Sequence, residues 1–399
     1  MANRILPFVV SHANTDTTRQ RDIDKALYQL EPDAAPLYVL TNQANRKQAS
    51  IDMKFQWFEE SEAALWGQQN TTTAFTTGDT DILVVDGTIF AAGDVVAVPA
   101  AVTATDEELL LVTAVATNTI TVTRGYASTT ATTLAAGSAL RIVGTAAVED
   151  SGVGAVVAPA PVAKTSYCQF FRDPVKLSEI ADATELYAIP NRRRHDQANV
   201  LIRHRSKIEA AGLWGKGVEA LSTSGGRWAT QGFKPTIAAG TNITNMGGTF
   251  TFSDMLTFGE TGFRYGEKRK LCMAGPAVLS AFDFFAASKL QVKTEENVLG
   301  VNIQKMVCNH GTYLLANNFR MEAGISGKNG YEDEMYLINL PSIKFRYLAG
   351  NGKNLNTRLL EDVVKDGTAG YVDEYRSVVG WQIMEEKKHS LAHNITSYA

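Results

Sequence analysis

Apolar residues recur at helical spacing in one long stretch near the middle of the chain, residues 190–211. The apolar positions of this stretch are Ala198, Leu201, Ile202, Ile208 and Ala211. They predict a helix with one narrow apolar stripe, about 30–35 Å long. Pro190 and Asn191 favour a start here, because proline biases the preceding residue towards an extended conformation and asparagine is a good N-cap. Gly212, Gly215 and Gly217 follow the stripe and predict the end of the helix.

A basic flank accompanies this predicted helix. Arg192, Arg193 and Arg194 fall in its first turn, and Arg203 and Lys207 lie four residues apart, which places them on one side. Positive charge in a first turn opposes the helix dipole, so these arginines carry a small cost there. The charge either solubilises the outer face of an ordinary amphipathic helix or serves to bind something negative.

An alternation of apolar and polar residues predicts a strand at residues 51–60. Its apolar face consists of Ile51, Met53, Phe55 and Trp57. The segment Tyr167–Val175 is the candidate for its returning partner. The gap of about a hundred residues between the two is too long for a hairpin loop, so we expect a folded unit to fill it.

The intervening segment, from residue 70 to about 148, is rich in Thr, Ala and Val, and its only basic residues are Arg124 and Arg141. Short β-like runs occur at 81–86, 88–90, 95–98, 109–114, 119–123 and 139–143. Short strands at this spacing, separated by glycine-containing turns, predict a small barrel or sandwich. Such a domain could bind a sugar or a partner. The lack of a His/Asp cluster favours plain structural or surface decoration instead.

The C-terminal half mixes helices and strands. We expect helices at 252–265, with Ser253 and Asp254 as the cap, and at 276–290. Strands are expected at 270–274, 301–308, 312–316, 334–338, 344–347, 370–376 and 378–384. Near the N-terminus, Asp22–Leu30 also has helical spacing. The fold class predicted for the chain is therefore α+β.

Composition narrows the class further. A hydrophobic content of 45% with 20% charged residues is typical of a folded, soluble protein. A net charge of -4 argues against sequence-specific nucleic-acid binding, although a local basic face remains compatible with it. Three widely spaced cysteines predict no disulfide framework and favour a reducing compartment during folding. Ile5–Val10 is too short for a signal sequence or a membrane span, so we expect synthesis in the cytoplasm and no membrane partner.

The candidate catalytic and metal-binding motifs in the sequence are all incomplete. His389 and His393 have the spacing of two zinc ligands on a helix but lack the accompanying glutamate. Cys308 and His310 have no second pair of ligands. A Gly-x-Ser-x-Gly elbow does not occur. We therefore expect no catalytic, cofactor or metal site, and no enzyme.

The order of features around the long helix resembles a known family. A lead-in at 167–181, the helix itself and a glycine-rich exit at 225–233 resemble the spine-helix region of tailed-bacteriophage major capsid proteins with the Hong Kong 97-like fold. Within that family, the chain is similar to the branch with a β-domain inserted in the extended loop. The resemblance implies an N-terminal arm (1–48), extended-loop strands (49–69 and 162–176), an inserted β-domain with its linker (70–161), a peripheral domain with the spine helix (177–232), an axial domain (233–345) and a return to the peripheral domain (346–399).

The resemblance also implies a function. The chain would be a major capsid protein that assembles with itself into hexamers and pentamers of an icosahedral shell around double-stranded DNA. A portal and a decoration protein are further implied partners. No long charged segment precedes the strand near Ile51, so we expect any scaffolding protein to be separate. The chain would assemble in the host cytoplasm and reside in the virion.

Two sets of residues carry specific expectations within this reading. Phe55, Trp57 and Phe58 are too apolar to stay exposed without a partner, so a neighbouring subunit should cover them in part. The basic flank should face the lumen and contact DNA phosphates without reading bases. Alternatively, its members are ion pairs that hold the fold. Two other functions stay open: an encapsulin-like nanocompartment shell, and a carbohydrate-binding or adhesive protein built on the β-domain.

Overall fold

The computed structural model of the chain describes residues 35–43, 46–60, 62, 64–70, 72–99, 107–149, 160–184, 191–220, 225–289, 292–294, 303–321, 330–363 and 370–398. The helix predicted at Asp22–Leu30 lies outside these residues. The chain divides into two compact units, one at Trp57–Lys164 and one formed by Met1–Gln56 together with Thr165–Ala399. We describe each unit by itself.

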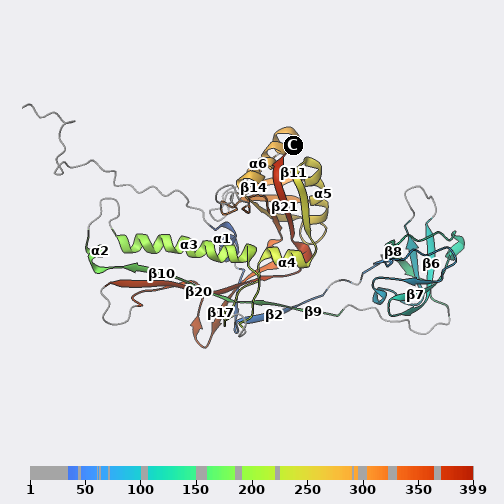
Figure 1. Ribbon diagram of the computed structural model, residues 1–399, viewed down its shortest axis with the longest axis horizontal. Coiled ribbons are helices and arrows are strands. Elements are labelled where there is room, and N and C mark those ends of the chain that lie inside the picture. Colours follow the sequence, from blue (N-terminus) through green and yellow to red (C-terminus); the bar gives the residue numbers. More distant parts are fainter. Residues whose placement is uncertain are drawn as a thin grey trace, which may run out of the picture. The chain divides into compact units, whose positions relative to one another are not determined.

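The larger unit contains a six-stranded sheet that lies against the long helix α3 (Arg192–Trp214) (Figure 1). Its strands follow the order β1 (Lys47–Ser50), β17 (Ile343–Gly350), β20 (Tyr371–Ile383) and β10 (Gln169–Leu177), with β18 (Lys353–Asn354) on β17 and β19 (Arg358–Leu360) on β20. The two strands expected at 370–376 and 378–384 are a single continuous strand, β20. It pairs antiparallel with β10 along nine residue pairs and forms the floor beneath α3.

Helix α3 occurs where the apolar stripe predicts it, but it ends later. The Asn191 side chain accepts a hydrogen bond from Arg194 N at 3.0 Å, as an N-cap does. The helix passes Gly212, the first of the three glycines expected to end it, continues to Trp214 and is capped by the second, Gly215. A Cβ atom at Gly212 would lie 2.7 Å from the ring of Trp381. Glycine is needed there because an indole packs against the helix backbone.

A second, seven-stranded sheet completes the larger unit. Its order is β11 (Ile243–Phe250), β21 (Ser390–Tyr398), β16 (Met335–Ile338), β12 (Arg269–Ala274), β15 (Thr312–Asn317), β14 (Ile303–Val307) and β13 (Val292–Thr294). Helices α5 (Phe252–Gly262) and α6 (Pro276–Lys289) contribute to a core shared with this sheet. The cap of α5 is Thr251, not the expected Ser253, and Thr251 forms a reciprocal capping box with Asp254.

A second core joins the two sheets to three helices. It contains buried side chains from α1 (Pro36–Gln43), α3 and α4 (Phe233–Ala239) as well as from strands of both sheets. Phe345 of the first sheet and Trp381 pack edge to face with ring centroids 5.2 Å apart. The sequence pattern did not predict α1, α4 or β21.

The strand expected at 51–60 is shorter and has a different partner. It is β2 (Lys54–Glu59), and it pairs with β9 (Val162–Tyr167) in a two-stranded sheet. The expectation that Tyr167–Val175 is the returning strand is wrong. That segment lies mostly in β10, because its alternating side chains Phe171, Asp173 and Val175 are buried in the larger unit.

The smaller unit is a closed six-stranded barrel. Its strands follow the order β3 (Trp66–Gln68), β8 (Ala139–Thr145), β5 (Asp94–Val98), β6 (Glu108–Ala116), β7 (Thr119–Thr123) and β4 (Asp81–Leu83). Two backbone bonds close the ring just beyond β3 and β4, Asn70 N to Leu83 O and Val85 N to Gln68 O, each 2.9 Å. The run expected as a strand at 88–90 is instead largely a 3-10 turn, Gly87–Ile89.

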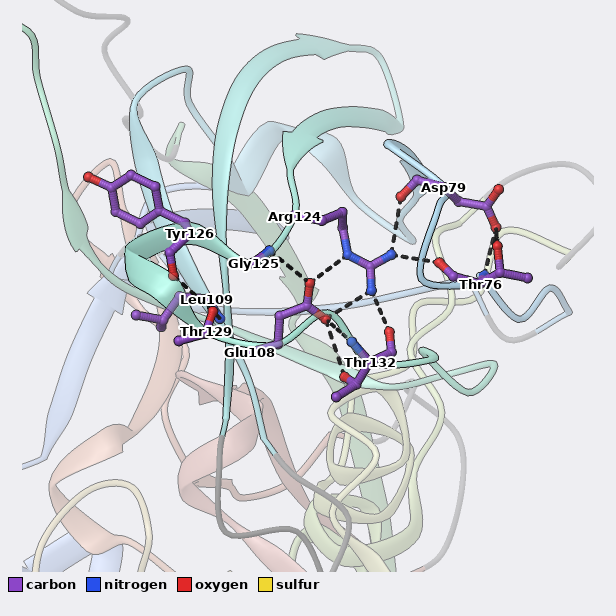
Figure 2. A network of polar contacts seen from close by, with 9 residues as sticks. All are labelled: Thr76, Asp79, Glu108, Leu109, Arg124, Gly125, Tyr126, Thr129 and Thr132. Carbon is purple, nitrogen blue, oxygen red and sulfur yellow. Dashed lines mark hydrogen bonds and ion pairs between the residues drawn. The ribbon is translucent and has the colours of Figure 1, made fainter.

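One buried ion pair fastens the loops of the barrel (Figure 2). Arg124 donates to both carboxylate oxygens of Glu108, at 2.7 and 2.8 Å, and both side chains are almost fully buried. The guanidinium also donates to the carbonyl oxygens of Thr76 at 2.7 Å and Asp79 at 3.1 Å. Thr132 N donates to Glu108 at 2.9 Å. Two loops are thereby tied to β6 and β7.

Candidate functional site

The three aromatic residues predicted to meet a neighbouring subunit lie on β2 with different exposures. Phe55 is 6% exposed and is covered within its own chain, where the Arg346 guanidinium lies 5.5 Å from its ring centroid. Trp57 is half-buried and donates from Nε1 to Glu59 at 2.7 Å. Phe58 is 75% exposed. Of the three, Phe58 leaves the largest apolar surface open.

The first turn of α3 uses one of its arginines inside the chain. Arg193 donates to both carboxylate oxygens of Asp373, at 2.7 and 2.5 Å, and to Asp362 at 2.8 Å. Its hydrogen bonds to Asp373 lower the pKa of that carboxyl to about 2. The Arg193 guanidinium also stacks 4.6 Å from the ring centroid of Tyr371. Arg193 therefore fixes α3 to β20.

Lys207 belongs to a second buried cluster between α3 and the sheet. Its ammonium pairs with Asp173 of β10, although the side chain itself is 43% exposed. His204 is fully buried, with Nδ1 at 2.7 Å from Asp173 and Nε2 at 2.6 Å from the Ser377 hydroxyl. Burial lowers the pKa of His204, which therefore stays neutral near pH 7 despite its neighbouring carboxylate.

The rest of the predicted basic flank is open. Arg192 approaches Asp196 at 3.7 Å on the helix surface. Arg194 and Arg203 are exposed and form no ion pair with another described residue. Arg205, which the sequence pattern did not single out, is exposed as well. The flank is thus divided into members that hold the fold and members that face outwards.

The sequence analysis also missed the inward-facing polar residues of α3, namely His204 and Glu209. The partners of His204 are a carboxylate and a hydroxyl, and those of Glu209 are amides. All of them come from segments distant in the sequence, so no local spacing marks the two residues. The strand at Gln169–Leu177 gives one weak indication of a polar cluster, because Asp173 takes a buried position whose neighbours in the alternation, Phe171 and Val175, are apolar.

The residues considered as metal ligands do not form a centre in the described part of the chain. No group of three or more His, Cys, Asp or Glu side chains that could hold a metal ion occurs among the described residues. His389 is buried, and its Nδ1 accepts a hydrogen bond from Asn339 N at 3.2 Å. His393 lies in the strand β21 and not in a helix. Among the described helices, none has the length and apolar character needed to cross a membrane.

The chain matches a known protein family along most of its length. The sequence profile of the SU10 major capsid protein family matches residues 10–396. The fold is similar to the capsid of a native GTA particle (TM-score 0.49, 9% identity, 96% of this chain and 98% of that chain). It is also similar to Mycobacterium phage Bobi (TM-score 0.43, 9% identity, 94% and 95%) and to the holo-SrpI encapsulin complex from Synechococcus elongatus PCC 7942 (TM-score 0.43, 9% identity, 60% and 80%).

A search of curated proteins gives no significant match. The family match covers both units of the chain, including the barrel at Trp57–Lys164. It therefore favours a capsid subunit over an adhesive protein built on the barrel, and over a nanocompartment shell. The chain belongs to the SU10 major capsid protein family, and it is a phage major capsid protein.

Proposed function

We propose that this capsid subunit lines the shell of a tailed bacteriophage with part of α3 turned towards the packaged double-stranded DNA. The observation that carries the proposal is the division of the basic flank. Arg193 and Lys207 are held by carboxylates of the same chain, whereas Arg194 and Arg203 are exposed. No carboxylate of the described chain explains these exposed guanidinium groups on a protein of net charge -4, whereas binding to DNA phosphates does.

The contact with DNA would be non-specific. Arginine near a phosphate releases condensed counterions, which favours binding without any base contact and makes it sensitive to salt. Arg193 and Lys207 contribute indirectly, because they fix α3 against β20 and β10 and so hold the open arginines in place. Arg192 is intermediate between the paired and the exposed arginines, because its ion pair with Asp196 is long and lies on the surface.

Assembly would depend on exposed aromatic residues of β2. Phe58 exposes an apolar ring that a second copy of the chain can cover, with Trp57 partly available beside it in sequence. Phe55 supports the strand from inside its own chain. Hexamers and pentamers are rings built from heterologous contacts, and interfaces of obligate assemblies bury roughly 2,000 Å² or more.

Other partners follow from the proposed role. We expect a portal and a separate scaffolding protein during assembly in the host cytoplasm, and a decoration protein could dock on the barrel. Residues 1–48 would serve as an arm on a neighbouring subunit, with the other divisions of the chain as the sequence analysis gives them. The protein has no proposed cofactor and no proposed reaction.

A pair of matched variants tests the genome-facing role. Arg194→Gln with Arg203→Gln removes two open charges, and we expect normal empty shells but particles that lose DNA at lower salt than wild type. Lys207→Gln is the control, because its ammonium is already paired with Asp173. The measurement is the ratio of full to empty particles in density gradients across a salt series. Equal ratios for the double variant and wild type would refute the proposal.

A further inference from the structure

Glu209 is a buried carboxylate at the meeting point of three elements. It lies near the C-terminal end of α3 and is 2% exposed. Its Oε2 accepts a hydrogen bond from Tyr38 N at 3.0 Å. Its Oε1 accepts from Asn318 Nδ2 at 2.6 Å, just beyond β15. One side chain thus connects α3, α1 and the seven-stranded sheet.

The contact with α1 is a helix cap supplied from another element. The first N–H groups of a helix have no partner within it, and Leu37 and Tyr38 lie in the first turn of α1, after Pro36. The carboxylate therefore takes the place of a local N-cap residue. A negative charge is also favoured at a helix N-terminus by the helix dipole.

Helix α1 is firmly seated around this cap. Leu37 and Leu40 are buried in the core that joins the two sheets. The Tyr38 ring packs edge to face on Phe345, with centroids 5.5 Å apart, and its hydroxyl lies 3.2 Å from Thr357 Oγ1. Detachment of α1 from the core would expose these buried side chains to water, so we expect it to be rare.

The charge on Glu209 is poorly compensated. Its two donors, Tyr38 N and Asn318 Nδ2, are neutral amides, and burial raises its pKa to about 7 in spite of them. Arg320 lowers the pKa of Glu209, but by less than burial raises it. A buried carboxylate without a close cationic partner favours any state in which water reaches it.

We propose that Glu209 is the positioning residue for α1 and that it makes the docking of this helix depend on a proton. When α1 opens, Glu209 meets water and returns towards the ordinary behaviour of a glutamate. Docking therefore takes up a proton in the range between the ordinary and the raised pKa. It is tightest in mild acid and weakens as the pH rises through neutrality. The proposed function enters only in that α1 belongs to the segment assigned to the arm.

Other charged and titratable groups near this site act differently. Arg320, beyond β15, is the cation that lowers the pKa of Glu209. His204 lies on the same helix, but its ring faces Asp173 and Ser377, with Lys207 beside it. Since burial lowers the pKa of His204, its protonation in acid would oppose the fold, opposite in sign to the effect of Glu209. The direction of the response therefore separates the two residues.

Hydrogen exchange of the full chain at pH 5.5 and 8.5 tests the proposal, read as protection factors of the α1 peptide after correction for intrinsic exchange. With a raised pKa of about 7 and an ordinary value near 4.5, we expect protection to be roughly thirty-fold higher at pH 5.5. The β12 peptide, Arg269–Ala274, serves as internal reference and should change far less.

Glu209→Gln sharpens the test because it keeps the volume and one acceptor oxygen but cannot ionise. We expect its α1 protection to be the same at both pH values. Equal protection of wild-type α1 at both pH values, an equal change in the β12 peptide, or a pH response retained by the variant would each overturn the proposal. None of these outcomes bears on DNA retention, so the proposed function stands or falls separately.

Discussion

Two buried glutamates, one in the barrel and one in the larger unit, have pKa values shifted in opposite directions. Glu108 and Glu209 are 1% and 2% exposed. Burial alone would raise the pKa of Glu108, but Arg124 and two backbone amides outweigh it and leave that pKa lowered. Among the described residues, the hydrogen-bond donors to Glu209 are neutral amides, and burial raises its pKa to about 7. The barrel pairs its buried glutamate with a buried cation, whereas the buried glutamate of the larger unit is held by neutral amides.

The contrast suggests two kinds of residue with different effects when substituted. Residues whose contacts lie within the chain, such as Arg124, His204 and Gly212, should affect the stability of the subunit. Groups that it leaves open, such as Phe58 and Arg203, should affect assembly or DNA retention while the subunit stays folded. Each of the following variants tests one side of that division.

The largest effect is expected for Arg124→Met. The change leaves Glu108 buried without its cation, and breaking such a pair costs about 3–5 kcal/mol. Urea unfolding of the full chain, with limited proteolysis to locate the loss in the barrel, measures it. Arg141→Met is the matched control, since Arg141 is exposed and stacks 5.0 Å from the ring centroid of Trp66. Similar losses for both variants would mean that the buried pair does not fasten the barrel.

His204→Ala should cost about 2–4 kcal/mol, because it leaves Asp173 and Ser377 without a buried partner. The contribution of His204 to stability should also decrease as the pH falls below about 6.5, opposite in sign to that of Glu209, since the unfolded histidine takes up a proton that the buried ring resists. Urea unfolding between pH 5 and 8 shows both effects. In the variant this pH dependence should shrink, and His195→Ala, at a half-exposed site, should change little.

Gly212→Ala should destabilise the subunit by about 1–3 kcal/mol, because the new methyl group would collide with the Trp381 ring. This result is informative, since alanine normally stabilises a helix relative to glycine. Gly350→Ala is the control, with open space around its site. Thermal unfolding of both variants suffices, and a stabilised Gly212→Ala chain would show that the indole does not constrain α3.

Phe58→Ala should have the smallest effect on the subunit, within about 0.5 kcal/mol, because its ring is largely exposed. It should nevertheless lower the yield of shells, and Trp57→Ala should do so as well. Phe55→Ala is the contrasting variant, because a buried phenylalanine costs about 3–5 kcal/mol when truncated. Particle counts by negative-stain microscopy, beside unfolding curves, separate the two effects. Normal yields from Phe58→Ala would remove β2 from the assembly contacts.

The sequence predicts α3 well because its signals are local, namely an apolar stripe and the Asn191 cap. It fails at Gly212, where the reason for glycine is a tryptophan 169 positions away in the chain. The barrel strands are likewise local, but the closure between β3 and β4 depends on hydrogen bonds that no run of residues reveals.

The buried polar residues of α3 depend on partners from distant segments of the chain. Asp173, His204 and Ser377 form one cluster from three distant segments, and Glu209 acquires its importance from α1, which the pattern did not predict. Single polar residues on a helix carry no periodic signal. Their partners become visible only when the strands and helices are in place.

A cryo-EM reconstruction of DNA-filled particles tests the central claim most directly. We predict an icosahedral shell built from this chain, with Arg194 and Arg203 on its inner surface beside DNA density and Phe58 covered by a neighbouring copy. A shell in which these arginines lie on the outer surface or pair with carboxylates of other subunits, and in which Phe58 stays exposed, would contradict the account.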